Sequence, residues 1–276
     1  MASKVMKRVL SNHFLRRCFC SVDNKITTAG IIVIGDEILK GEVADTNSTF
    51  LAVELHLMGL KLEKISVIGD DVKAVCGEVR HFAGIYDYVL TSGGIGPTHD
   101  DITYEAVALA FNQPLVLDPL LKEICMKFYN TTDVKYPGMK LAYIPKTSKL
   151  TFSDGAAGLK MAYPNVSIKN VYMFPGIPEL LVKSFSNLKG VLFKSDKKFY
   201  TKSIYFNITE DKIVAALEKL VKEYPNVQFG SYPKLLHRVY KVKVTIESCC
   251  EESTDEAYNK LMTLVPRQYI VNIDDI

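Results

Sequence analysis

The chain has 276 residues, of which 48% are hydrophobic and 24% charged, so it can form about two globular domains with full cores. No apolar run approaches the roughly 20 residues of a membrane span, and the six cysteines show no zinc-binding spacing. The net charge of +3 arises in the first 25 residues, while the remainder is mildly acidic. We therefore expect neither a nucleic acid nor a membrane as partner.

Residues 1–25 differ in composition from the rest of the chain. They contain six Lys or Arg residues and several serines, but only one acidic residue, Asp23. Their apolar residues could line one face of a helix. This composition is typical of a mitochondrial transit peptide and predicts import into the matrix. The alternative is a basic tail on a cytoplasmic protein.

Predicted strands and helices alternate from residue 28 to residue 111. The first strand, 28–35, is an apolar and β-branched run, as expected for a buried parallel strand. The following elements are a helix at 45–59, a strand at 63–68, a helix at 72–82, a strand at 88–90 and a helix at 101–111. This alternation predicts a doubly wound α/β domain, over residues 26–190, with a mostly parallel sheet. Ligands of such sheets bind at the carboxyl ends of the strands.

The pattern is weaker between residues 114 and 158 and then changes. We expect a helix at 120–129, a strand at 170–174 and a helix at 178–185. Residues 191–276 then read as a smaller α+β subdomain. Its elements are a strand at 199–206, a helix at 209–224, strands at 227–231 and 239–247, and a helix at 253–264.

The first motif with chemical potential follows the 28–35 strand. Gly35 allows the chain to turn, and Asp36 and Glu37 place carboxylates in the expected crevice. Asp45 and Asn47 enter the next helix, where their side-chain oxygens can cap the helix or bind a ligand. Taken alone, this motif is explained equally well as a loop with an ordinary helix cap.

The second motif is a glycine-rich turn between the 88–90 strand and the next helix. Bare glycine amides can approach a phosphate, but the carboxylates of the same turn repel it unless a cation lies between them. The turn therefore indicates metal-assisted phosphate chemistry. Its polar and glycine residues are Gly93, Gly94, Gly96, Thr98, His99, Asp100, Asp101 and Thr103. His99 either contacts phosphate or is simply solvated.

The third motif is Pro175-Gly176-Ile177-Pro178-Glu179, which alone predicts a rigid turn. Together, the three motifs resemble the molybdopterin-binding (MoaB/Mog-type) domain family. They resemble in particular the branch with bacterial competence-damage-inducible protein A and the N-terminal half of eukaryotic FAD synthase. The segments 229–233 and 239–245 are similar to the KH-like subdomain of that branch. The resemblance covers about residues 27–265.

The resemblance implies metal-dependent hydrolysis of a nucleotide pyrophosphate such as FAD or ADP-ribose. It implies a divalent ion (Mg²⁺, Mn²⁺ or Co²⁺), no tightly bound organic cofactor, and a homo-oligomer. The implied metal ligands are Asp36, Glu37, Asp45, Asp100 and Asp101, of which Asp36, Asp45, Asp100 and Asp101 are the catalytic candidates. The implied phosphate- and nucleotide-binding residues are Gly35, Gly93, Gly94, Gly96, Thr98, His99, Thr103, Pro175 and Gly176.

Three hypotheses follow from the resemblance. The first is the pyrophosphatase, with FAD cleaved to FMN and AMP. The second is a non-catalytic module that binds a flavin nucleotide or pterin and regulates a FAD-synthesising partner. The third is molybdopterin adenylyl transfer, which the turn disfavours because that branch usually carries an arginine before a single aspartate.

The residues given end at Ile276, before any FAD-synthesising domain, so we do not expect FAD formation from them. The single glycine of residues 199–265, Gly230, leaves no Gly-x-x-Gly loop for RNA.

Overall fold

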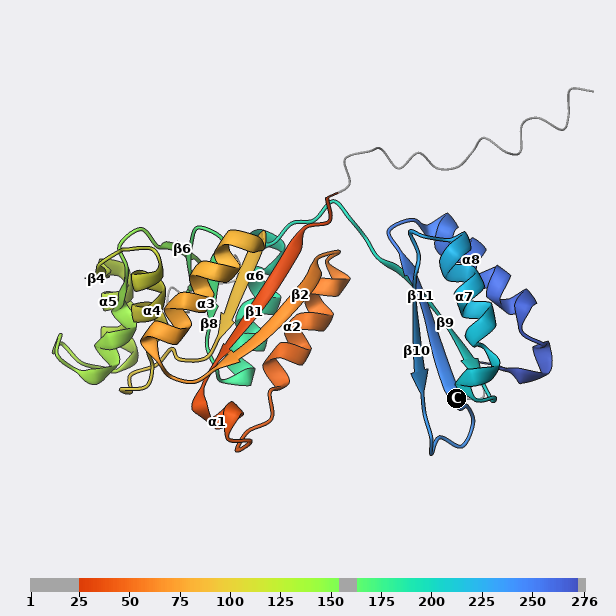
Figure 1. Cartoon of the computed structure of the whole chain (residues 1–276). Helices are drawn as coiled ribbons and strands as arrows, with labels where there is room; N and C mark the ends of the chain where they lie inside the picture. Colours follow the sequence, from red (N-terminus) through yellow and green to blue (C-terminus); the bar gives the residue numbers. More distant parts are fainter. Residues whose placement is uncertain (1–24, 154–162, 273–276) are drawn as a thin grey trace, which may run out of the picture.

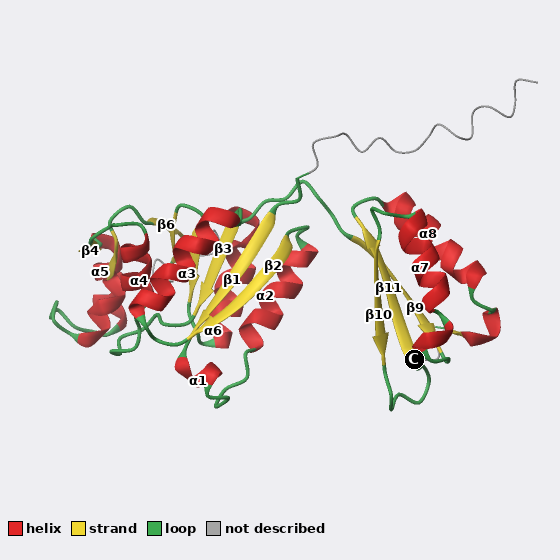
Figure 2. Cartoon of the chain, in the orientation of Figure 1, coloured by secondary structure: helices red, strands yellow, loops and turns green. Residues whose placement is uncertain are grey.

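The structure is a computed structural model that describes residues 25–153 and 163–272. The predicted transit peptide, residues 1–25, lies outside these residues except for Lys25. The chain forms two units, an α/β unit followed by a smaller α+β unit, joined by a short segment (Figure 1, Figure 2). Within the described residues, no helix combines the length and apolar character needed to cross a membrane.

A six-stranded sheet forms the centre of the first unit, with strand order β2-β1-β3-β8-β7-β6. Its first four strands are parallel, whereas β7 and β6 extend the sheet in antiparallel pairing. The strands are β1 (Thr28–Ile34), β2 (Lys61–Ile68), β3 (Tyr88–Ser92), β6 (Lys149–Thr151), β7 (Asn165–Ile168) and β8 (Val171–Phe174). The predicted doubly wound, mostly parallel sheet is thereby confirmed.

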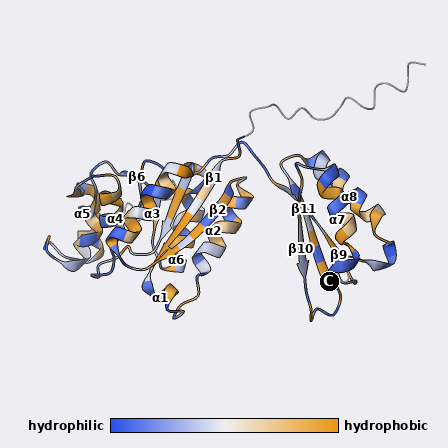
Figure 3. Cartoon of the chain, viewed as in Figure 1, coloured by the Kyte–Doolittle hydropathy of each residue, from blue (hydrophilic) through white to orange (hydrophobic). Residues whose placement is uncertain are grey.

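Helices cover both faces of this sheet, which explains why β1 is apolar at consecutive positions. Ile32 and Ile34 pack towards α3, α4 and α5, while Ile31 and Val33 pack towards α2 and α6. The strands are correspondingly hydrophobic in Figure 3. The helices are α1 (Asp36–Leu39), α2 (Thr46–Leu57), α3 (Val72–Ile85), α4 (Thr103–Ala110), α5 (Pro119–Phe128) and α6 (Pro178–Leu192).

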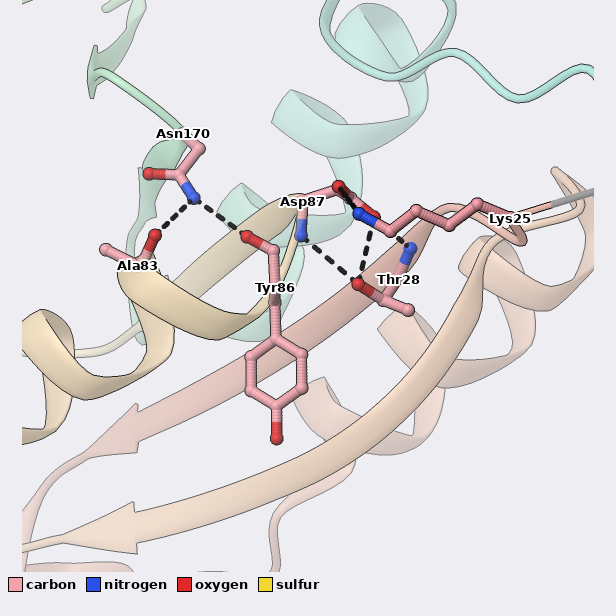
Figure 4. Close-up of polar contacts among 6 residues, drawn as sticks. All are labelled: Lys25, Thr28, Ala83, Tyr86, Asp87 and Asn170. Atoms are coloured by element: carbon pink, nitrogen blue, oxygen red, sulfur yellow. Dashed lines mark hydrogen bonds and ion pairs between the residues drawn. The ribbon is translucent and has the colours of Figure 1, made fainter. Parts of the chain in front are cut away.

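Hydrogen bonds fasten the amino-terminal edge of the sheet (Figure 4). The Asp87 carboxylate accepts from the backbone N–H of Thr28 at 2.9 Å and from its hydroxyl at 3.0 Å. The hydrogen bond from the Thr28 backbone is the main cause that lowers the pKa of Asp87. Beside it, the Asn170 side chain donates to the carbonyl oxygens of Ala83 and Tyr86. These bonds fix where the chain enters β1.

The second unit is an antiparallel sheet of order β10-β11-β9-β12, against which two helices pack. Its core includes Ile204 and Val244 from the strands and Leu220 and Leu261 from the helices. The elements are β9 (Tyr200–Phe206), a 3-10 turn η3 (Glu210–Lys212), α7 (Val214–Glu223), β10 (Gln228–Pro233), β11 (Val242–Ser248), α8 (Glu251–Leu264), η4 (Arg267–Tyr269) and β12 (Ile270–Val271).

Several elements differ from the predicted ones. Helix α6 continues to Leu192 rather than ending near 185, and the helix expected at 209–224 is divided into η3 and α7. Short elements that the sequence pattern did not predict also appear, several of them between residues 114 and 158. They are α1, β6, β7, β12, the 3-10 helix η1 (Pro137–Ala142), and a small hairpin of β4 (Leu115–Leu117) and β5 (Tyr143–Pro145).

Candidate functional site

The three motifs meet at the carboxyl edge of the parallel strands, because β1, β3 and β8 all end there. The backbone N–H of Gly93 donates to the Phe174 carbonyl oxygen at 3.2 Å. Gly93 has a φ of 106°, and a Cβ there would lie 2.0 Å from the Ile34 carbonyl oxygen. A Cβ on Gly176 would lie 3.2 Å from the Gly93 Cα. A side chain is therefore excluded at Gly93 and would be crowded at Gly176, so the ends of the three strands approach closely.

Asn47 ties helix α2 to this junction. Its side-chain amide donates to the Ser92 hydroxyl at 2.9 Å and to the Gly176 carbonyl oxygen at 2.7 Å. The residue is only 9% exposed, and its Oδ1 atom is buried without a hydrogen-bond partner. A buried acceptor without a donor is costly, so a ligand or water that donates to Oδ1 would bind favourably.

The glycine turn supplies fewer amides than the sequence predicts. The N–H of Gly93 is already used within the sheet, and that of Gly35 donates to the Ile68 carbonyl oxygen at 3.0 Å. These two predicted phosphate-binding residues therefore shape the backbone instead of offering an amide. For Gly94 and Gly96, the structure of the described residues records no partner of the backbone N–H. Their amides are therefore available as hydrogen-bond donors.

Two aspartates of the same turn converge on Thr98. Its hydroxyl lies 2.5 Å from an Asp100 oxygen and 2.6 Å from an Asp101 oxygen, and its N–H donates to Asp101 at 2.8 Å. The hydrogen bond from the Thr98 hydroxyl is the main cause that lowers the pKa of Asp100. Asp100 is therefore ionised at neutral pH. Lys140 approaches from η1 and donates to the Thr98 carbonyl oxygen.

The two other polar residues of the turn play different parts. Thr103 is fully buried, and its hydroxyl donates to the Gly93 carbonyl oxygen at 2.8 Å. This hydrogen bond stabilises the turn and occupies the Thr103 hydroxyl, so the contact explains the residue without a ligand. The His99 side chain is 98% exposed, with Nδ1 3.7 Å from an Asp100 oxygen. It is free to contact a ligand at the mouth of the crevice.

The carboxylates of the first motif have neighbours of their own. Asp36 pairs with Lys40 at 3.2 Å, and this contact is the main cause of its lowered pKa. In addition, the backbone N–H of Asp36 donates to the Asp70 carboxylate, and the backbone N–H of Asp70 donates to the Asp36 carboxylate. Asp45 caps α2 by accepting from the Ser48 N–H at 2.9 Å. Glu37 is exposed. Local contacts thus explain Asp36 and Asp45 without any ligand.

A ready-made metal cage is not formed by these side chains. Among residues 25–153 and 163–272, no group of three or more His, Cys, Asp or Glu residues is arranged to hold a metal ion. The expected convergence of Asp36, Glu37, Asp45, Asp100 and Asp101 on one ion is therefore absent from this conformation. The Asp100–Asp101 pair still fits a cation that is shared with a ligand, because Mg²⁺ is commonly held by one or two carboxylates plus substrate phosphates.

Asn47 was expected to cap a helix or bind a ligand, whereas Ser92 and Lys140 were given no role from the sequence. Asn47 and Ser92 act through a contact between distant segments, and Lys140 belongs to the region where the sequence pattern is weak. Asn47 lies in the first motif, so its polar side chain at the start of a buried helix face was the available signal. Nothing in the sequence pointed to Lys140.

The fold and the site together define a doubly wound α/β protein whose glycine turns meet at the carboxyl edge of its sheet, the edge where such proteins bind ligands. The comparison with known families agrees with this class. The chain belongs to the family described as the probable molybdopterin binding domain, whose model matches residues 30–194. The model of the FAD synthase middle domain matches residues 198–274.

Similar proteins come from animals and archaea. A probable FAD synthase of Caenorhabditis elegans is 36% identical over 258 residues, which are 86% of this chain and 50% of that protein. The chain thus spans about half the length of the FAD synthases it matches. A protein of Archaeoglobus fulgidus is 34% identical over 74% of this chain and 85% of its own length. The crystal structure of CinA from Thermoplasma acidophilum, whose function is given as unknown, matches with a TM-score of 0.54 and 27% identity. It covers 60% of this chain and 98% of that one.

Proposed function

We propose that this protein hydrolyses the pyrophosphate bond of FAD, giving FMN and AMP, with a divalent metal ion. The observation that carries the proposal is the meeting of the glycine turn with the ends of β1 and β8, where Gly96 lies beside the Asp101 carboxylate and both Asp100 and Asp101 converge on Thr98. The family description names molybdopterin and the relatives are named FAD synthases, so both names point to a phosphorylated heterocycle.

In the proposed reaction, the oxygen of water forms a bond to one phosphorus atom while the bridging P–O bond breaks. The water protons pass to solvent or to a carboxylate of the site. A divalent ion bound with the substrate would polarise a phosphoryl oxygen. Asp100 and Asp101 would hold it, and the amides of Gly94 and Gly96 would donate to the negative charge that develops.

The test is incubation of the purified chain with FAD and Mg²⁺, Mn²⁺ or Co²⁺, followed by chromatographic separation of FMN and AMP. We expect Asp100→Asn and Asp101→Asn to lower kcat/KM by at least about tenfold, since each removes a metal-binding charge. Glu105→Gln is the matched control, because Glu105 is exposed in the first turn of α4 and makes the same charge change. Absence of turnover with FAD and with ADP-ribose, under all three ions, would refute the proposal.

A second candidate is a binding module without catalysis, which regulates a separate FAD-synthesising protein. The involvement of Asp36 and Asp45 in local contacts favours it, because fewer carboxylates remain for an ion. Calorimetric titration with FAD, FMN and a pterin distinguishes the two candidates. Saturable binding with no product after long incubation supports the module, whereas product formation excludes it.

Location and assembly complete the proposal. We place the protein in the mitochondrial matrix as a homo-oligomer, on the basis of the basic composition of residues 1–25 and the family resemblance. Cell fractionation of the full-length chain, with and without these residues, tests the location. Light scattering of the purified protein measures its molar mass.

A further inference from the structure

The connection between β10 and β11 presents two leucines to solvent. We call residues 234–241 the hairpin tip. Leu235 and Leu236 in this tip are 96% and 97% exposed. The Lys234 N–H donates to the Lys241 carbonyl oxygen at 2.7 Å and closes the loop. The His237 ring packs on Tyr240 with centroids 3.9 Å apart. The loop is thus internally bonded, and its fold holds both leucines outwards.

The hairpin tip is also positively charged. It contains Lys234, Arg238 and Lys241 but no acidic residue. All three residues are exposed, and no ion pair of their side chains is recorded within the described part of the chain. Exposed leucines flanked by unpaired cations are typical of a surface that binds an acidic partner with apolar character.

The first unit carries a surface of the opposite kind. We call residues 36–45 the acidic segment, which includes α1 and leads into α2. It contains four carboxylates and one lysine. Leu39 and Val43 within it are 58% and 52% exposed. The segment borders the crevice, since it follows the end of β1. Its charge and its exposed apolar side chains complement those of the hairpin tip.

The two units contact each other at a junction that lies about equally far, along α2 and along β11, from the acidic segment and from the hairpin tip. His56, near the end of α2, stacks on Phe199 with centroids 4.8 Å apart, and its Nε2 lies 3.1 Å from a Glu247 oxygen on β11. From His56 to the start of α2 is about 15 Å at 1.5 Å per residue. From Glu247 to the start of β11 is about 17 Å at 3.3 Å per residue. Helix α1 and the β10–β11 connection lie towards the same side of the molecule (Figure 1).

We propose that the hairpin tip docks on the acidic segment of the same chain, through a rotation about the junction at His56. Docking seats Leu235 and Leu236 against Leu39 and Val43. It also brings Lys234 and Arg238 to the rim of the crevice, where cations attract a phosphorylated ligand. This inference goes beyond the proposed function, and its test requires no turnover.

Cysteine cross-linking tests the contact directly. The variant Val43→Cys/Leu236→Cys is oxidised, and the products are separated on a non-reducing gel and mapped by mass spectrometry. The control is Val43→Cys/Val221→Cys, since Val221 is 53% exposed on α7, away from the tip. Both variants retain the native cysteines, so their background oxidation is shared. We expect a disulfide within one chain that forms at least about tenfold faster than in the control.

Two results would overturn the same-chain contact. Equal rates in the two variants would show that the tip does not approach the acidic segment. A 43–236 disulfide found only at twice the chain mass would assign the tip to a second copy. A membrane would be the partner instead if the 43–236 disulfide does not form and the protein co-sediments with phosphatidylserine vesicles. In that case Leu235→Ser/Leu236→Ser should abolish the co-sedimentation.

Charge reversal separates a specific contact from random collision. Arg238→Glu in the cross-linking variant should slow disulfide formation, because it places like charges opposite each other. Adding Glu42→Lys should restore the rate. Salt at about 1 M shortens the Debye length to about 3 Å, so it should slow disulfide formation in the cross-linking variant without charge reversal. A rate that neither reversal nor salt changes would contradict charge-guided docking.

Discussion

Replacing Asn47 tests whether its amide holds the three motifs together. Asn47→Ala removes the hydrogen bonds to Ser92 and to Gly176 and leaves the Gly176 carbonyl oxygen without its donor. Each lost bond is worth about 1 kcal/mol. We therefore expect the free energy of unfolding of the first unit to fall by about 2 kcal/mol.

Asn47→Asp keeps the shape but makes the effect depend on pH. Burial and the Gly176 carbonyl oxygen, which lies 2.7 Å from the present Nδ2 atom, disfavour an ionised carboxyl group at this position. Its folded-state pKa should therefore exceed the unfolded value of about 3.9. The folded state then binds the proton more tightly, so stability falls as pH rises above about 4, by about 1.4 kcal/mol per unit of pKa shift.

The assay is urea unfolding at pH 5 and pH 8, followed by circular dichroism, because the chain contains no tryptophan. The matched control is Ser48→Ala, the next residue of α2, whose buried hydroxyl has no partner. Its removal should leave stability unchanged or slightly raised. The reasoning fails if Asn47→Ala unfolds at the same urea concentration as Ser48→Ala. It also fails if the difference in unfolding free energy between Asn47→Asp and the unmutated chain is the same at pH 8 as at pH 5.

Two further predictions concern the glycine turn at Gly93 and the carboxylate of Asp87, which lie at opposite edges of the sheet. Gly93→Ala should lower the free energy of unfolding by at least about 2 kcal/mol, because φ is 106° and the new Cβ meets the Ile34 carbonyl oxygen. In Gly77→Ala, on α3, the new Cβ meets nothing within 4 Å, so the free energy of unfolding should rise by about 0.5–1 kcal/mol. Equal shifts of the melting temperature in Gly93→Ala and Gly77→Ala would contradict this reasoning. Because the pKa of Asp87 is lower in the folded state than in the unfolded state, its ionised carboxylate stabilises the fold at pH values above the unfolded-state pKa. This stabilisation is lost as the pH falls through the folded-state pKa. Asp87→Asn should therefore lower the melting temperature at pH 7 and have less effect at about pH 3, and the opposite trend would exclude the Thr28 contact as its cause.

The alternation of elements was predictable because the long elements carry strong patterns. The apolar run of β1 reflects helices on both of its faces, and the cap at Asp45 was visible from its place before a helix. Strands of three or four residues, such as β4 and β6, are too short to show a period of two. They arise from pairing with distant segments, which a single sequence does not display.

The site was predictable in position but not in detail. Parallel strands end at a common edge, so the Gly35 and Gly93 turns were expected there, whereas the contact of Gly93 with Gly176 depends on the pairing of β3 with β8. The bond from Asn47 to Gly176 spans 129 residues and leaves no local signal. The aspartates were expected to converge, yet Asp36 and Asp45 hydrogen-bond to nearby backbone, as short polar side chains in turns commonly do.

The fastening of Thr28 to Asp87 has a practical consequence for handling the protein. It holds the beginning of β1 at the amino-terminal edge of the sheet, while the crevice opens at the carboxyl edge. An affinity tag or a surface linker attached ahead of Lys25 therefore departs from the base of the first unit. Immobilisation through that end leaves the mouth of the crevice facing the bulk solution, where ligands can be titrated without steric hindrance.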